Sequence, residues 1–340
     1  MRPLRANLKT LAIVGLAVAI AALVCVLPET PYQRWQLLDG TIHKNTRWIY
    51  ERSHFDPTPI DVAFVGPSRT GAGVNAPRLA EVLAARGLPA NVVNFSLPET
   101  GRNINYAIVE EMLKEKHPRL LVLGVIEKPS RYGHSAFKYV ARPGLVADPG
   151  YLGNWHYFPD LMYLPFRQMR LFAADVLPGG TGLARQFDPG AYRGHAVDTT
   201  GDVLLPDGSM KQATYPAPYG ELMRGVNKLE RTSTPPVLPA DWADVEFGDE
   251  RHYIRRIVAL ARAHNVKVAF LFLPYYTGPS QLQEQAFYEQ FGPVWNAGYL
   301  ANHAEFYADY GHLTKSAAMQ LTDWLAGPVS SALSPTQGAP

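Results

Sequence analysis

The chain has 340 residues, of which 47% are hydrophobic and 18% are charged, so it can bury a core as one large domain or two medium ones. Its 32 basic and 30 acidic residues leave a net charge of +2, which argues against a nucleic-acid-binding protein. The single cysteine, Cys25, excludes a disulfide scaffold and a cysteine-based zinc cluster.

The N-terminal segment is typical of a membrane anchor. Residues 10–28 carry no charge and, as a helix, span about 28 Å, close to the hydrocarbon thickness of a bilayer. Arg2, Arg5 and Lys9 precede this segment, which places the N-terminus in the cytoplasm and the rest across a bacterial inner membrane, in the periplasm. A cleaved signal peptide is the alternative, but the residues that follow offer no small-x-small cleavage site. The sequence therefore predicts an uncleaved anchor over residues 1–28.

A helical stem is expected over residues 29–57, followed by an α/β domain over residues 58–326. In that domain, short apolar runs alternate with amphipathic segments, which predicts a parallel sheet with right-handed crossovers and helices on both faces. The predicted strands are 60–65, 92–95, 120–126 and 266–273, and the predicted helices are 75–86, 103–116, 249–264, 280–291 and 314–326.

The alternation stops between residues 128 and 247, a stretch rich in Pro, Gly, Tyr and Trp. We expect this stretch, about 130–247, to be a large insertion. It contains a hairpin over 203–211 that turns at Asp207 and Gly208, and a helix over 161–176 with Pro165 in its first turn. Residues 327–340 are predicted to be a disordered tail.

Polar residues that could carry chemistry follow the predicted strands. Active sites in open parallel sheets form at the carboxyl ends of the strands, and Ser68 follows the first strand directly. Asp309 and His312 lie three residues apart just before the last helix, so the carboxylate can orient the imidazole and leave its Nε2 free to face the serine. This spacing predicts a Ser-His-Asp triad, in which the serine is a nucleophile activated by a base.

Similar short motifs occur elsewhere, and their position distinguishes them. Ser135 and Ser280 also follow a glycine by two residues, and Asp249 and His252 repeat the Asp-x-x-His spacing. Ser280 is better interpreted as a helix N-cap, with Gln283 completing a capping box, and Asp249 as the cap of its own helix.

The combination resembles the SGNH/GDSL hydrolase superfamily, in its membrane-anchored bacterial form. The segments GPSRT, VVNFSLPETGRN and YADYGHLTKSAAMQLTDWLA resemble its first, second and closing blocks, and the likeness covers residues 58–126 and 249–326. The resemblance implies a three-layer, flavodoxin-like sandwich and an oxyanion glycine from the second block, so Ser68, Gly101 and Asn103 are the expected members of the oxyanion hole. The Asn that the family places after the third strand is absent, and Asn103, Asn105 or Lys128 are candidate substitutes.

Each candidate also has a purely structural interpretation. Ser68 and Asp309 can serve as helix caps, and His312 can be a loop histidine whose ring hydrogen-bonds to backbone groups. Gly101 can be present only because a turn requires a glycine there. Arg69, Arg102, Lys128 and Arg131 follow strand ends and are candidate contacts for an anionic substrate, or simply solvated charges. The aromatics of the insertion could stack on sugar rings or pack in a satellite core; they are Trp155, Tyr157, Phe158, Tyr163 and Phe166. No metal-ligand spacing and no phosphate-binding glycine loop is present, so no metal or cofactor is expected.

The sequence thus predicts a periplasm-facing serine esterase or O-acyltransferase that acts on ester groups, acetyl above all, of an envelope or exported polysaccharide. Its partners would be the acylated carbohydrate, the inner membrane and proteins of a polysaccharide machinery, and no nucleic acid. Two alternatives stay open. The first is an inactive SGNH-like binding or scaffold subunit, which the missing Asn favours, and the second is a membrane-tethered α/β domain with another ligand.

Overall fold

A parallel sheet forms the centre of the molecule. The structure, a computed structural model, describes residues 2–149, 154–177, 179–201, 203–204 and 209–334, and in these it contains one all-parallel sheet of five strands. The strand order is β2-β1-β3-β6-β7, which confirms the predicted parallel α/β sheet. The strands are β1 Val62–Val65, β2 Val92–Asn94, β3 Leu120–Val125, β6 Lys267–Phe272 and β7 Val294–Asn296. Strand β7 was not predicted, because its three half-buried residues give too short a pattern.

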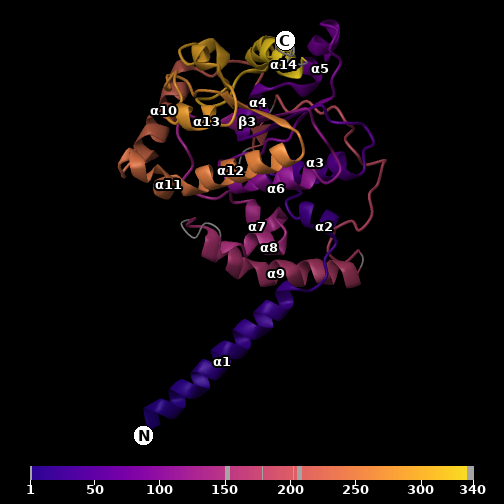
Figure 1. Cartoon of the computed structure of the whole chain (residues 1–340), viewed down its shortest axis with the longest axis vertical. Helices are drawn as coiled ribbons and strands as arrows, with labels where there is room; N and C mark the ends of the chain where they lie inside the picture. Colours follow the sequence, from indigo (N-terminus) through magenta and orange to yellow (C-terminus); the bar gives the residue numbers. More distant parts are fainter. Residues whose placement is uncertain (1, 150–153, 178, 202, 205–208, 335–340) are drawn as a thin grey trace, which may run out of the picture.

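Helices cover both faces of the sheet (Figure 1). Successive strand residues point to opposite faces, so Val62 and Phe64 pack with the helices on one side, whereas Ala63 and Val65 join a second cluster on the other. The first side carries α5 Ala76–Ala85, α10 Tyr219–Thr232 and α14 Lys315–Leu333, and the second carries α3 Asn45–His54, α6 Arg102–Met112 and α12 Gly248–Ala263. Asn75 caps α5 by accepting a hydrogen bond from the Arg78 N–H.

The segment expected to be a stem belongs to the core of the α/β domain. It contains α2 Pro31–Trp35 and α3, and the indoles of Trp35 and Trp48 are buried in the same cluster as the sheet residues. The expected stem over 29–57 is therefore wrong. Large aromatic side chains stabilise the fold most when they are buried, and the domain provides the surface that covers them.

Residues between β3 and β6 add no strand to the central sheet in the parts that the structure describes. The predicted hairpin is present as an antiparallel pair of β4 and β5, and its turn at 207–208 lies outside the described residues. The helix predicted from residue 161 begins earlier, as α9 Tyr157–Val176, so Pro165 lies inside the helix and not in its first turn. The other elements here are α7 Phe137–Val140, α8 Pro143–Val146, β4 Val203–Leu204, β5 Met210–Lys211, η2 Ala240–Trp242 and α11 Ala243–Glu246.

The C-terminal part differs from the prediction in two places. Only α13 Gln285–Glu289 is helical within 280–291, and its N-cap is Glu284, so the capping role predicted for Ser280 is wrong. The last helix, α14, begins after its cap Thr314 and continues through Pro328 to Leu333, where a disordered tail was expected. Residues 335–340 of that tail lie outside the described residues. The short helices η3 Gly298–Leu300 and η4 Ala304–Phe306 precede α14.

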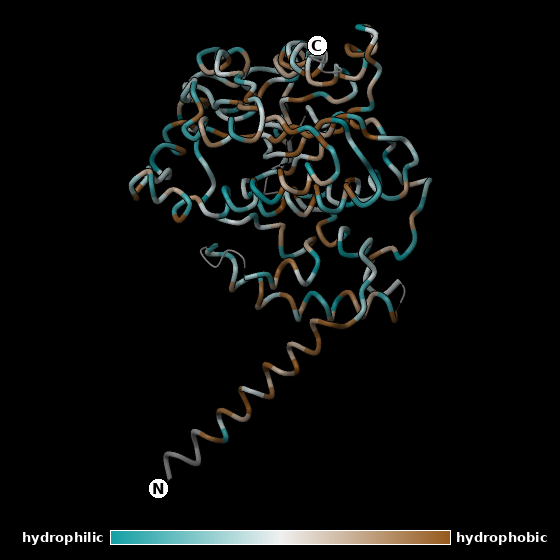
Figure 2. The backbone as a smooth tube through the Cα atoms, in the orientation of Figure 1, coloured by the Kyte–Doolittle hydropathy of each residue, from teal (hydrophilic) through white to brown (hydrophobic). Residues whose placement is uncertain are grey.

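One helix projects away from the domain. This is α1 Arg2–Cys25, and its segment Leu8–Cys25 has a mean hydropathy of 2.4 with none of its residues buried (Figures 1 and 2). Among the described residues it is the one helix long and apolar enough to cross a membrane. Its position near the N-terminus fits a membrane anchor or a signal sequence.

Candidate active site

Ser68 is held at the carboxyl end of β1 by close backbone packing. It is the first residue of α4 Ser68–Gly73, two residues after Gly66. A Cβ on Gly66 would lie 2.9 Å from the Gly124 Cα, and a Cβ on Gly124 would lie 1.9 Å from the Thr70 Oγ1. Glycine at both positions therefore lets the first turn of α4 lie directly against the ends of β1 and β3.

Asp309 and His312 share one tight loop between η4 and α14. An antiparallel bridge between Tyr307 and Leu313 closes the loop. The Asp309 Oδ1 accepts hydrogen bonds from the backbone N–H groups of Gly311, at 2.8 Å, and of His312, at 2.9 Å. This Asx-type turn folds the chain back on itself, and the spacing of three residues follows from it.

The structure brings the three predicted residues together. His312 Nε2 lies 2.7 Å from the Ser68 Oγ, and His312 Nδ1 lies 2.8 Å from the Asp309 Oδ2. With a proton on Nδ1, the imidazole donates to the carboxylate, and Nε2 accepts from the serine hydroxyl. This is the arrangement in which a histidine can remove the proton of an attacking serine.

Asp309 is held in its charged form. Burial by itself raises the pKa of this carboxyl, but the hydrogen bond and charge of His312 and the N–H groups of Gly311 and His312 outweigh that effect. The pKa of Asp309 therefore lies below its ordinary value. A carboxylate at this position stabilises the imidazolium that forms when His312 takes a proton.

The cleft that exposes Ser68 is built partly by segments in which no site residue was predicted. Lys44 and Asn45 come from the supposed stem, and Thr199 comes from the residues between β3 and β6. Ser96, directly after β2, also lines the cleft, and its buried Oγ has no hydrogen-bond partner within the described residues. Ser96 belongs to the SLPETGRN segment, so its position after a strand was the signal that could have identified it.

Gly101 and Asn103, the other expected oxyanion donors, do not line this cleft. Gly101 has a φ of 142°, and a Cβ there would lie 2.3 Å from the backbone nitrogen of His134. The Asn103 side chain is fully buried, and its Oδ1 accepts from the N–H groups of Ile104 and His134. Both residues therefore have packing roles, and the structure gives no support to the oxyanion role expected for them.

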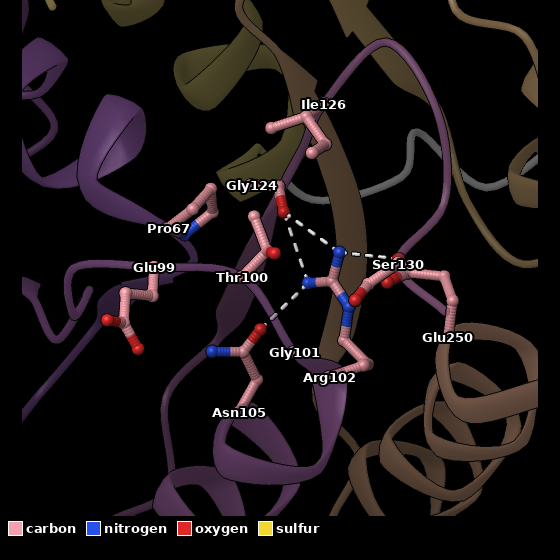
Figure 3. Close-up of a pocket in the computed structure, with 10 residues that line it drawn as sticks. All are labelled: Pro67, Glu99, Thr100, Gly101, Arg102, Asn105, Gly124, Ile126, Ser130 and Glu250. Atoms are coloured by element: carbon pink, nitrogen blue, oxygen red, sulfur yellow. Dashed lines mark hydrogen bonds and ion pairs between the residues drawn. The ribbon is translucent and has the colours of Figure 1, made fainter. Parts of the chain in front are cut away.

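Arg102 lies in the interior, where its side chain is buried away from any substrate. Its guanidinium donates to the Glu250 carboxylate at 2.6 Å and to the Gly124 carbonyl and the Asn105 Oδ1, beside a small pocket that Gly101 and Pro67 also line (Figure 3). The structure therefore gives no support to the substrate contact predicted for Arg102, since the β3 carbonyl and the buried Glu250 already use its donors.

Asp249 has a different partner from the one predicted. The N-cap of α12 is Phe247, and the Asp249 Oδ2 instead accepts from the Arg102 N–H at the start of α6. Its predicted role as the cap of its own helix is wrong. Burial, reinforced by the neighbouring charge of Glu250, raises the pKa of Asp249 to about 7.

Arg69 lies beside the triad, but its charge is already compensated. It forms an ion pair with Glu127, which follows β3, and its guanidinium lies 5.4 Å from the centre of the Tyr275 ring. A Cβ on Gly311 would lie 3.6 Å from the Arg69 Nε, so the side chain packs against the loop of Asp309 and His312. Arg69 is therefore placed to support that loop.

Lys128 lies in a different pocket. Its Nζ is 3.4 Å from the Thr234 carbonyl, and it lines a cleft with Tyr275 and Glu230 that does not include Ser68. The ends of β3 thus present Ile126, Glu127 and Lys128 and no asparagine. No residue of β3 or of the loop that follows it lines the Ser68 cleft, so this strand end supplies no substitute for the asparagine that the resemblance implies. Arg131, the fourth cation after a strand end, pairs with Glu246.

One side-chain cluster has the donors of a metal site, although no spacing in the sequence points to it. Ligand atoms of His43, Glu99 and His134 lie within 4.8 Å of one another. The His134 Nε2, however, lies 2.5 Å from the Pro98 carbonyl, and its Nδ1 accepts from the Ala136 N–H. Burial lowers the pKa of His134 to about 3, so its ring is neutral and both of its nitrogens are engaged. We therefore assign no metal to this cluster.

The aromatics that were candidate sugar contacts lie on or next to α9, at the other end of the molecule from α5 and α14 (Figure 1). None of them lines the Ser68 cleft. Trp155, Phe158 and Phe166 are exposed, so they do not pack in a satellite core either.

Comparison with known proteins adds no relative: no protein-family model matches the chain, and no curated protein matches it.

Proposed function

We propose that the protein is a membrane-anchored serine esterase or O-acyltransferase of SGNH type, acting on acyl esters, acetyl above all, of an envelope or exported polysaccharide. The observation that carries the proposal is the hydrogen-bonded chain from Ser68 through His312 to Asp309. Ser68 and His312 are 244 residues apart in the chain, so this contact is not a local one and only the tertiary fold brings the two side chains together.

The reaction runs through an acyl-enzyme. The Ser68 Oγ attacks the ester carbonyl carbon while its proton passes to the His312 Nε2, and the tetrahedral adduct then expels the alcohol, which takes that proton from His312. The acyl group stays on Ser68. An incoming hydroxyl, of water in an esterase or of a sugar in a transferase, gives its proton to His312 and attacks the acyl carbon, which frees Ser68 in its protonated form.

Two donors are available for the oxyanion. The N–H of Ser68 lies in the first turn of α4, where backbone N–H groups have no intrahelical acceptor. The buried Ser96 Oγ in the same cleft is a second donor that needs a partner. Donors of this kind stabilise the charge that develops on the carbonyl oxygen, and removing one costs about 10²–10³ in rate in serine hydrolases.

A second function, an inactive binding or scaffold subunit, is favoured by one observation. The stretch from Gly124 to His134 after β3, where the resemblance implies an asparagine, contains none. Glu127 in this stretch is a buried carboxylate paired with Arg69, and a carboxylate cannot donate to an oxyanion. In this alternative the cleft would bind the polysaccharide without cleaving it. The two functions differ in whether Ser68 is nucleophilic.

A fluorophosphonate probe distinguishes them, because it labels only a serine that an adjacent base activates. The full-length chain is purified in detergent and treated with the probe beside Ser68→Ala and His312→Ala, with Ser280→Ala as the matched control, since Ser280 also follows a glycine but is exposed on a loop. We expect labelling of the wild type and of Ser280→Ala, and none of the other two. A folded wild type that takes no label refutes the enzyme and leaves the binding subunit, for which binding of acetylated and deacetylated polysaccharide is then measured.

A further inference from the structure

Helix α9 presents a continuous apolar stripe to the outside of the molecule. Phe158, Met162, Phe166 and Met169 are 63%, 73%, 64% and 45% exposed, and their spacing of three and four residues places them on one face of the helix. Trp155, just before the helix, is 76% exposed. Apolar residues on the outer face of a surface helix are unusual in a monomer in water, and here they form one row.

The opposite face of α9 is fixed to the domain. Leu164, Leu171 and Ala174 are buried, and the buried guanidinium of Arg167 donates to the carbonyls of Lys138 and Ala141. The helix therefore cannot turn its apolar stripe inward. No other segment of the part of the chain that the structure describes covers the stripe, which leaves it open to an external partner.

The same helix holds the end of α1. The Gln168 Nε2 donates to the Leu27 carbonyl at 3.5 Å, and the Thr30 hydroxyl donates to the Asp175 carboxylate at 2.7 Å. Cys25, the last residue of α1, packs against the core of the domain. In Figure 1, α1 leaves the domain from the side along which α9 lies, and Figure 2 shows the apolar character of α1 continuing up to that junction. These contacts make the end of α1 part of the folded domain, which fits an anchor that stays attached.

We propose that α9 is an interfacial membrane helix, which lies along the bilayer surface with the stripe from Phe158 to Met169 among the lipid headgroups and upper acyl chains. The inference rests on the proposed membrane anchor. The 18-residue segment Leu8–Cys25, whose one charge is Lys9 near its start, spans about 27 Å as a helix, which matches the hydrocarbon core, so residues 26–30 lie in the headgroup region. Because Gln168 and Asp175 of α9 are hydrogen-bonded to this short segment, the second half of the helix lies at the same depth, and the apolar stripe would keep the first half there too.

The composition of the stripe suits this environment. Trp and Phe are favoured at the boundary between headgroups and hydrocarbon, and an in-plane helix buries its apolar face there to a depth of about 5–10 Å. Two points of attachment, α1 and α9, would fix the orientation of the domain. The end with α5 and α14, where α4 packs against α14, would then face away from the membrane (Figure 1).

Depth-dependent fluorescence quenching tests the proposal with the full-length chain in vesicles of phosphatidylethanolamine and phosphatidylglycerol. The only cysteine is removed as Cys25→Ser, and single cysteines are introduced as Met162→Cys, Phe166→Cys or, as the control, Ala84→Cys, which is exposed on α5 at the opposite end. Each is labelled with the environment-sensitive dye NBD, and spin-labelled lipids are added as quenchers. We expect blue-shifted, strongly quenched emission at 162 and 166, and unquenched emission at 84.

Emission at positions 162 and 166 that matches the unquenched emission at position 84 overturns the proposal. A blue shift that appears only at high protein density overturns it too, because it would mean that a second copy of the chain covers the stripe. Extraction of the vesicles with alkaline carbonate separates this failure from failure of the anchor. A chain that stays in the lipid fraction with unquenched α9 positions has an anchor but no interfacial helix, whereas a chain that is released has neither. The probe labelling of Ser68 is independent of both results.

Discussion

Replacing Asp249 with asparagine should remove a large pH dependence of the free energy of unfolding. Asp249 is fully buried at the start of α12, and its Oδ2 accepts from the Arg102 N–H while its Oδ1 has no hydrogen-bond partner within the described residues. Asparagine has nearly the same shape and keeps a carbonyl oxygen for the Arg102 N–H. The substitution therefore removes the titration and disturbs the packing little.

The magnitude follows from the pKa. Burial, together with the charge of Glu250, raises the pKa of Asp249 from 3.8 to about 7. Between these pH values the folded chain holds a proton that the unfolded chain has released, so the stability of the wild type falls as pH rises. At about 1.4 kcal/mol per pH unit the loss attributable to Asp249 reaches about 4 kcal/mol by pH 7 and stays constant above it.

Urea unfolding in detergent, followed through the fluorescence of the buried Trp35 and Trp48, measures this effect for the wild type and Asp249→Asn between pH 4 and pH 8. The difference in unfolding free energy should move in favour of the variant by about 4 kcal/mol across that range. Asp241→Asn is the control, because Asp241 is exposed in the folded chain. A difference between Asp249→Asn and the wild type that is constant with pH would refute the reasoning.

Three further predictions concern the site. Asp309→Asn should lower the rate of probe labelling about a thousandfold or more without unfolding the chain, because the amide favours the wrong tautomer of His312; a labelling rate close to that of the wild type would contradict the triad. Ser96→Ala should lower kcat for a nitrophenyl acetate ester by about 10²-fold with little change in KM, whereas a rise in KM alone would assign Ser96 to substrate binding. Gly124→Ala should lower the free energy of unfolding by about 1–3 kcal/mol or more, and with it the midpoint of thermal unfolding, because the added Cβ would overlap Thr70. Thr70→Ala in the same chain should recover part of the loss, and an unchanged melting curve for Gly124→Ala would disprove the close packing.

Much of the architecture could be predicted from local pattern. The apolar runs of β1, β3 and β6 are short and buried on both faces, so their hydrophobicity alone indicated a parallel sheet. The elements that were missed carry weak local signals. Strand β7 has only three residues, and α9 accommodates a proline at its ninth position because the tertiary packing of its buried face outweighs the local cost.

The candidate site likewise has a part that the sequence predicts and a part that it does not. Ser68, Asp309 and His312 could be predicted, because a strand end and an Asx-type turn are local features and the parallel sheet fixes which edge they share. Gly101, Asn103 and Arg102 stand close to the same strand ends, but Gly101 lies against the His134 backbone and the other two side chains turn into the interior. Only the packing of α6 against His134 and α12 decides that.

By itself, the sequence determined the apolar N-terminal helix, the parallel sheet and the residue types able to form the triad, since each depends on hydrophobicity or on contacts within a few residues. Only the tertiary structure decided that the segment after the anchor belongs to the core, that Lys44, Thr199 and Ser96 complete the cleft, and that α9 turns its apolar stripe outward beside α1. These features join segments that are distant in the chain, and burial against such partners, more than local propensity, fixes where a side chain points.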